Sequence, residues 1–253
     1  MQQANNKGFT LVELSIVLVI IGLLIGGLLA AQSLINTTKI QAFTRQIQQI
    51  DAAVSNFITM YKRLPGDSAL MYASGDNNGL VEPSLTTVYD DEVANFWPSL
   101  SYSGFKGEEN PTTGYTATLS YNGSFPFNAP NAPRSKAGRD AGILAVGDTL
   151  AGIFTEQDNI NLYLVANCTG MTSTAISCRN AFSGADAIAI DMKMDDGVGT
   201  SGYVAGANLA AAETDLLNLY DTVASTYTPG STVSNTVGYY IAIRMGAQVG
   251  QVR

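Results

Sequence analysis

The sequence feature that constrains this chain most is an unbroken apolar run close to its N-terminus. The run from Leu14 to Ala31 contains no charged residue and no proline. A helix needs about 20 predominantly apolar residues to cross a bilayer. The run therefore predicts a membrane-spanning helix, with one acidic residue, Glu13, at its start.

The segment before this run is short and polar, and its order is unusual for an exported protein. The first eight residues, MQQANNKG, lead directly into Phe9-Thr10-Leu11-Val12-Glu13. An ordinary secretory signal has its cleavage site after the apolar region. A polar leader, a glycine, a phenylalanine and a glutamate five residues after the glycine closely resemble the prepilins of type IV pili and of type II secretion pseudopili.

The resemblance implies how the N-terminus is processed. A prepilin peptidase would cleave between Gly8 and Phe9, remove residues 1–8, and methylate the new amino group of Phe9. Glu13 would then pair with the N-terminal amine of a neighbouring subunit during assembly, which accounts for a carboxylate that is otherwise costly in hydrocarbon. The alternatives are an anchor whose leader is never cut, and a Glu13 that simply lies in the headgroup layer.

Three glycines interrupt the apolar run. Gly22 and Gly26 have the small-xxx-small spacing that lets membrane helices approach each other closely, and Gly27 follows directly. Glycine also weakens a helix by up to about 1 kcal/mol relative to alanine. These positions are candidates both for helix packing and for local melting.

Beyond Ala31 the apolar residues are confined to one helical face. No proline or glycine occurs between Gly27 and Leu64, so one helix from Phe9 to Arg63, about 80 Å long, is predicted. Pro65-Gly66 ends it. The one-sided pattern predicts burial on a domain, with a coiled-coil seam as the alternative. Its residues, spaced three and four apart, are Ile40, Phe43, Ile47, Ile50, Val54, Phe57 and Tyr61.

The chain thus divides into a leader (1–8), a membrane and assembly segment (9–33), and a globular domain (34–253) that includes the amphipathic helix 34–63. The predicted fold class is α+β. The resemblance implies a pilin-like fold, in which the long N-terminal helix packs on a C-terminal antiparallel β-sheet with long variable loops. Strands are predicted at 116–121, 142–146, 161–166, 187–192 and 239–245, and helices at 94–100 and 208–220.

Composition excludes several classes of function. The chain has no histidine, which rules out Ser-His-Asp and Cys-His mechanisms and any His-ligated zinc site. Its 21 acidic and 13 basic residues give a net charge of -8, so direct nucleic-acid binding by the bulk domain is not expected. The sequence contains no phosphate-binding glycine loop and no nucleophile elbow, and no enzymatic activity is predicted.

Two cysteines, Cys168 and Cys178, lie close together in the sequence. In a chain whose bulk lies outside the cytoplasm, such a pair is expected to form a disulfide, which would stabilise the fold by roughly 2 to 3 kcal/mol. A cysteine metal site would need more than these two ligands.

Two acidic loops are candidate calcium sites, and no other cofactor is expected. Asp191, Asp195 and Asp196 lie in the run DMKMDDG, which resembles a run in pseudopilin-like proteins, some of which hold calcium in a C-terminal loop. The second candidate contains Asp76 and Asn78. Closely spaced oxygen ligands suit a hard cation, but a polar turn held by Asp side chains is the simpler alternative.

The resemblance implies a structural subunit of a type IV pilus or a type II secretion pseudopilus. Its expected partners are other copies of itself, other pilins or pseudopilins, prepilin peptidase and an inner-membrane assembly platform. Before assembly it would be a single-pass inner-membrane protein with a periplasmic domain. The alternatives are a minor tip pilin for adhesion or DNA uptake, a non-polymerising membrane-anchored binding domain, and a membrane-anchored hydrolase.

Overall fold

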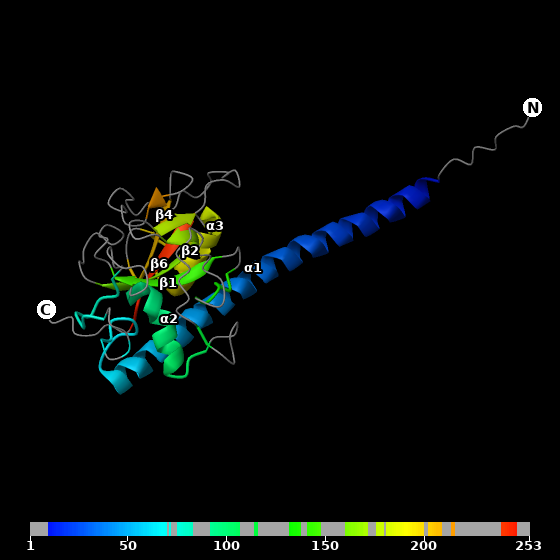
Figure 1. The fold of residues 1–253 in the computed structure, drawn as a ribbon. Helices are drawn as coiled ribbons and strands as arrows, with labels where there is room; N and C mark the ends of the chain where they lie inside the picture. Colours follow the sequence, from blue (N-terminus) through cyan, green and yellow to red (C-terminus); the bar gives the residue numbers. More distant parts are fainter. Residues whose placement is uncertain are drawn as a thin grey trace, which may run out of the picture.

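The computed structural model describes residues 10–69, 71, 75–82, 92–106, 114–115, 132–137, 141–147, 160–171, 176–179, 181–199, 202–208, 214–215 and 239–246. Its elements in chain order are α1 (Leu11–Tyr61), α2 (Glu92–Tyr102), β1 (Gly142–Gly147), β2 (Asn161–Met171), β3 (Ile176–Arg179), α3 (Gly184–Met194), β4 (Val204–Asn208), β5 (Thr214–Asp215) and β6 (Tyr239–Arg244). Figure 1 shows α1 as a long rod that lies against the other elements with one half and projects away from them with the other.

The long N-terminal helix is continuous, as predicted. Thr10 caps its N-terminus, and at its C-terminus Lys62 adopts a left-handed conformation and donates its N–H to the carbonyl of Ile58 at 2.8 Å. The helix thus ends at Tyr61, two residues before the predicted end at Arg63. Pro65 cannot continue a helix, and it disfavours the helical conformation in the residue before it.

The apolar stripe of α1 is buried within the subunit. Phe43, Ile47, Ile50, Val54 and Phe57 are at most 1% exposed and belong to one core with the strands, α2 and α3. Packing on the domain is therefore confirmed, and the coiled-coil alternative is wrong. A helix whose apolar residues recur every three to four positions can cover a sheet in this way because they all lie on one face.

The sheet is antiparallel throughout the described residues and is centred on β2. Its four main strands run in the order β1-β2-β6-β4, and Leu164 of β2 lies opposite both Leu144 of β1 and Ala242 of β6. The C-terminal part of β2 pairs with β3, which pairs with β5. Every residue of β1 is buried, so both of its faces are covered. The α+β class with an antiparallel sheet is confirmed.

The predicted strands at 142–146, 161–166 and 239–245 correspond to β1, β2 and β6, and the predicted helix at 94–100 lies within α2. The predicted strand at 116–121 lies outside the described residues. The strand predicted at 187–192 is wrong, because those residues belong to the helix α3.

The alternation Ala187-Ile188-Ala189-Ile190 was misleading because the same residues also fit a helical face. Ser183 caps α3, accepting a hydrogen bond from the N–H of Asp186, and Ala187, Ile190 and Asp191 are buried at helical spacing. A favourable N-cap and packing beside α1 outweigh the strand preference of two isoleucines.

The helix predicted at 208–220 is contradicted at the positions that can be compared. Asn208 is the last residue of β4, and Thr214–Asp215 form β5. Both segments pair with neighbouring strands, which provides tertiary hydrogen bonds that the local sequence does not reveal. The rest of that predicted helix lies outside the described residues.

The carboxylate of Asp51 connects α1 to the sheet through hydrogen bonds. Asp51 accepts hydrogen bonds from the hydroxyl of Tyr163 in β2, from the hydroxyl of Tyr203 next to β4, both at 2.9 Å, and from the N–H of Gly246 after β6 at 3.2 Å. Burial, together with the charge of Asp51, raises the pKa of Tyr163 well above its usual value. The tyrosine hydroxyl therefore stays protonated and donates.

Replacing Asp51 by alanine should lower the free energy of unfolding by about 3 kcal/mol, because it removes three hydrogen bonds to a charged acceptor and leaves the buried Tyr163 hydroxyl without its acceptor. Thermal unfolding of the full chain in detergent, followed by the fluorescence of the single, buried tryptophan Trp97, measures this loss. Asn56→Ala, at an exposed position of α1, is the control and should change little. Equal stability of the two variants would contradict the anchoring role.

Candidate functional site

The N-terminal half of α1 presents an apolar surface that the subunit itself does not cover. All residues from Thr10 to Lys39 are exposed, including Leu11 at 85% and Leu23 at 73%. Within the described residues, α1 is the one helix long and apolar enough to cross a membrane, and none of its apolar window is buried. An exposed apolar surface of this length requires lipid or other protein chains as its surroundings.

At the N-terminal end of this surface, Thr10 and Glu13 cap the helix through reciprocal hydrogen bonds. The hydroxyl of Thr10 accepts a hydrogen bond from the N–H of Glu13 at 3.3 Å, while the Glu13 carboxylate accepts from the N–H of Thr10 at 2.9 Å and from its hydroxyl at 2.8 Å. Such a capping box satisfies N–H groups that a helix N-terminus leaves without partners. Glu13 therefore has partners within the isolated chain. Gly8 and Phe9, the predicted cleavage site, lie outside the described residues.

The three glycines of the apolar run face open space. A Cβ built on Gly22, Gly26 or Gly27 would meet no atom within 4 Å outside the helix itself. Their spacing is therefore not required by packing within the subunit. These glycines leave the helix backbone accessible to another helix, but their packing role stays a prediction.

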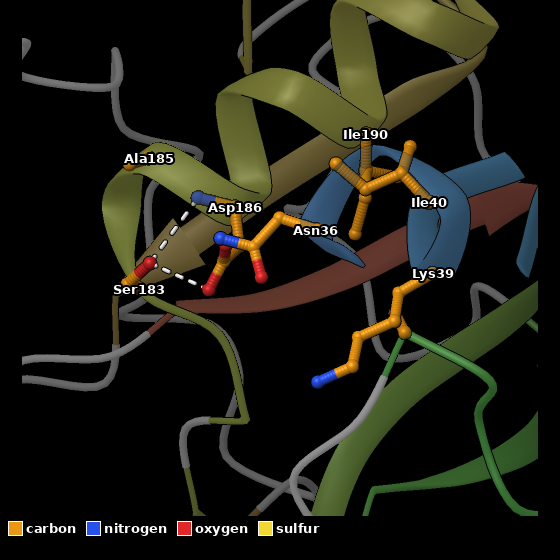
Figure 2. A pocket seen from close by; sticks show the side chains of 8 residues that line it. Asn36, Lys39, Ile40, Ser183, Ala185, Asp186 and Ile190 are labelled. Atoms are coloured by element: carbon orange, nitrogen blue, oxygen red, sulfur yellow. Dashed lines mark hydrogen bonds between the residues drawn. The ribbon is translucent and has the colours of Figure 1, made fainter. Parts of the chain in front are cut away.

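A hollow of about 380 Å³ lies where α1 leaves the domain (Figure 2). The start of α3 forms one side, where Ser183 donates to the Asp186 carboxylate at 2.7 Å and caps the helix. Asn36 and Lys39 of α1 form the other side, and both lie at the edge of the exposed segment. The hollow is a polar boundary between the buried and exposed halves of α1.

The acidic loop after α3 brings together the three predicted carboxylates. Oxygens of Asp191, Asp195 and Asp196 lie within 4.8 Å of one another. However, Asp195 accepts hydrogen bonds from the N–H groups of Tyr203 and Val204, and Asp191 accepts from the N–H of Gly197 at 3.0 Å. These bonds have the form of a turn held by Asp side chains, the simpler alternative for this run.

The position of the Asp195 carboxylate explains why residue 202 in this loop is a glycine. A Cβ at Gly202, whose φ is +81°, would lie 1.9 Å from the Asp195 carboxylate. Asp195 can reach the backbone of the next strand only because no side chain intervenes.

The second acidic loop is assembled differently from the prediction. Asp76 lies within 4.8 Å of Asp67 and Glu92, whereas Asn78 donates to Asp76 at 3.1 Å and to Glu82 at 2.9 Å as a bridging amide. Sequence reasoning missed Asp67 and Glu92 because each lies in a different segment, 9 and 16 residues away from Asp76. Their proximity depends on the tertiary packing of α2 beside α1.

Cys168 of β2 lies directly opposite Cys178 of β3 in the strand register. Directly opposite residues in antiparallel strands have α-carbons about 4.5 to 5.5 Å apart, within the range that a disulfide spans. The backbone arrangement is therefore compatible with the predicted disulfide.

A family comparison identifies the N-terminal segment. The prokaryotic N-terminal methylation motif matches residues 3–29, which include Gly8, Phe9, Glu13 and most of the exposed apolar surface. This motif is the hallmark of the prepilins of type IV pili and pseudopili, and the chain carries it. No curated protein and no solved structure matches the chain. The motif supports a prepilin-type structural protein, and the exposed apolar half of α1 is consistent with a membrane anchor.

Removing residues 1–31 should yield a domain that stays in solution without detergent and unfolds at nearly the same temperature as the full chain. The reason is that the removed residues of α1 are exposed and contribute nothing to the core. Sedimentation tests solubility, and the fluorescence of Trp97 reports unfolding. A large drop in the unfolding temperature would show that the exposed half of α1 supports the domain after all.

Proposed function

We propose that this protein is a structural subunit of a type IV pilus or a type II secretion pseudopilus, and that it polymerises through the N-terminal half of α1. The observation that carries the proposal is an exposed apolar helical segment, from Leu11 to Ile35, most of which lies within the methylation motif. The surrounding lipid can cover this surface before assembly, and the same surface can pack on other copies afterwards.

The mechanism of such a subunit is mechanical. Its helix must be apolar enough to reside in a bilayer and equally able to bury against neighbouring helices, so the free-energy difference between the two environments stays small. The globular domain, held on the other half of α1, would lie in the periplasm and form the outer layer of the filament. In this proposal a prepilin peptidase processes the chain, and an inner-membrane assembly platform extracts it from the membrane.

Glu13 connects processing to assembly in this proposal. In the isolated chain its carboxylate bonds to Thr10 within the capping box. Cleavage between Gly8 and Phe9 creates an amine one helical turn away in sequence. During assembly the Glu13 carboxylate of one subunit would pair with the amine of another, which neutralises both charges and sets the axial register.

Glu13→Val should insert into the membrane and be cleaved normally but assemble poorly in competition with the wild-type chain, because it lacks the charge that pairs with the neighbouring amine. Co-expression followed by quantification of each chain in sheared filaments measures incorporation. Ser15→Ala, two residues further along the exposed half of α1, should incorporate like the wild type. Equal incorporation of Glu13→Val would remove the charge-pairing argument.

Intact-mass analysis of the native protein should show the loss of residues 1–8 and the addition of one methyl group at Phe9. If Cys168 and Cys178 form a disulfide, the measured mass should increase by about 2 Da upon reduction, because two hydrogens are added. An unprocessed N-terminus would overturn the proposed pathway, while an unchanged mass upon reduction would overturn only the disulfide. The copy number per filament then distinguishes a major subunit from a minor tip subunit.

A further inference from the structure

Three carboxylates from separate segments converge beside the C-terminal end of α1. Asp67 follows α1, Asp76 lies in the next loop, and Glu92 is the first residue of α2. Carboxylate oxygens of the three residues lie within 4.8 Å of one another. Calcium ligands lie about 2.3 to 2.6 Å from the ion, so two ligands on opposite sides are about 5 Å apart. The three carboxylates are close enough to share one ion.

A glycine allows this approach. Gly66 has a φ of +85°, and a Cβ at this position would lie 2.3 Å from the backbone oxygen of Glu92. The N–H of Gly66 also donates to the hydroxyl of Ser99 in α2 at 3.3 Å. The backbone before Asp67 is therefore held directly against α2, and this contact brings the two carboxylates together.

Asp67 has a buried oxygen without a partner. Its side chain is 1% exposed, and while its Oδ2 accepts from the N–H of Gly79 at 2.9 Å, its Oδ1 is inaccessible to water and has no hydrogen-bond partner. Such an oxygen costs free energy unless something compensates for its lost hydration. The carboxylates next to it, Asp76 and Glu92, cannot donate when they are ionised.

The remaining hydrogen bonds hold the cluster in place without neutralising it. Glu92 accepts from the N–H groups of Asp76 at 3.2 Å and Glu82 at 2.9 Å, and Asp76 accepts from the N–H of Asn78 at 2.9 Å. Burial raises the pKa of Glu92 to about 7, and the charges of Asp67 and Asp76 add to this effect. Burial also raises the pKa of Asp67. Raised pKa values of this kind are expected where buried carboxylates lie close together and repel one another's charge.

We propose that Asp67, Asp76 and Glu92 bind a calcium ion that ties the loop after α1 to the first turn of α2. Oxygen-only ligands favour a hard cation, and calcium tolerates irregular ligand arrangements where magnesium demands a near-ideal octahedron. The ion would give the buried Oδ1 of Asp67 its missing partner. Asp76 is exposed, so the ion has a path from solvent.

The site would make the stability of the domain depend on calcium. A ligand that binds only the folded state stabilises that state in proportion to the logarithm of its concentration relative to Kd. Extracellular calcium modules bind with Kd of about 10⁻⁴ to 10⁻³ M, and we expect this range here. The subunit would then reach full stability only outside the cytoplasm, where calcium is plentiful.

The test uses the full chain in detergent after treatment with a chelator. Isothermal titration with calcium chloride should give binding near one ion per chain, and the unfolding temperature reported by Trp97 should rise by roughly 5 to 10 °C at 100 times Kd. Asp67→Asn and Glu92→Gln should weaken binding at least tenfold and reduce the rise at the same calcium concentration to about half or less. Asp76→Asn repeats the test at an exposed position, where the substitution leaves the core intact.

Asp196→Asn is the matched control, because Asp196 is a carboxylate in the other acidic loop. It should keep both the affinity and the rise in unfolding temperature. The proposal fails if calcium produces no heat of binding and no rise in the unfolding temperature. It also fails if Asp196→Asn abolishes calcium binding while Asp76→Asn retains it. Equal stabilisation by magnesium chloride at the same concentration would overturn the assignment of calcium.

Discussion

The rest of the structure depends on the burial of one face of α1 between Phe43 and Phe57 against the sheet and its covering helices. This contact supplies much of the core, and the Asp51 carboxylate adds a polar connection to three segments of the sheet. Because α1 is one continuous helix, fixing its C-terminal half also fixes the direction in which its N-terminal half projects. The apolar half therefore cannot fold back onto its own domain.

That constraint accounts for the proposed function. A soluble domain would bury an apolar segment of this size, but here a rigid helix holds it beyond reach of the sheet (Figure 1). The segment must be covered by lipid or by other chains. The capping box gives Glu13 local partners within the isolated subunit. In the proposed assembly, an amine from another copy would replace Thr10 as the partner of this carboxylate.

The two acidic loops are similar in composition, but their carboxylates have different hydrogen-bond partners. Asp195 uses its carboxylate to bond the backbone amides at the start of β4, which makes it part of a turn. Asp67 has one bonded and one unpartnered oxygen, and it lies beside two further carboxylates. The sequence offered the run with Asp195 as a metal candidate because its acids are close together in the chain and the run resembles one in pseudopilin-like proteins. Of the other cluster the local pattern offered only Asp76, because Asp67 and Glu92 lie in separate segments of the chain.

The sequence by itself determined the parts of this protein that depend on local periodicity: the apolar half of α1, its buried stripe, its end near Pro65, and the prepilin motif around Glu13. Short segments were decided by tertiary structure. Residues 187–192 alternate like a strand but form α3, because Ser183 caps the helix and Ala187, Ile190 and Asp191 bury one helical face. The meeting of Asp67, Asp76 and Glu92 likewise required the packing of α2 against the end of α1, since only long-range contacts bring separate segments of a chain together.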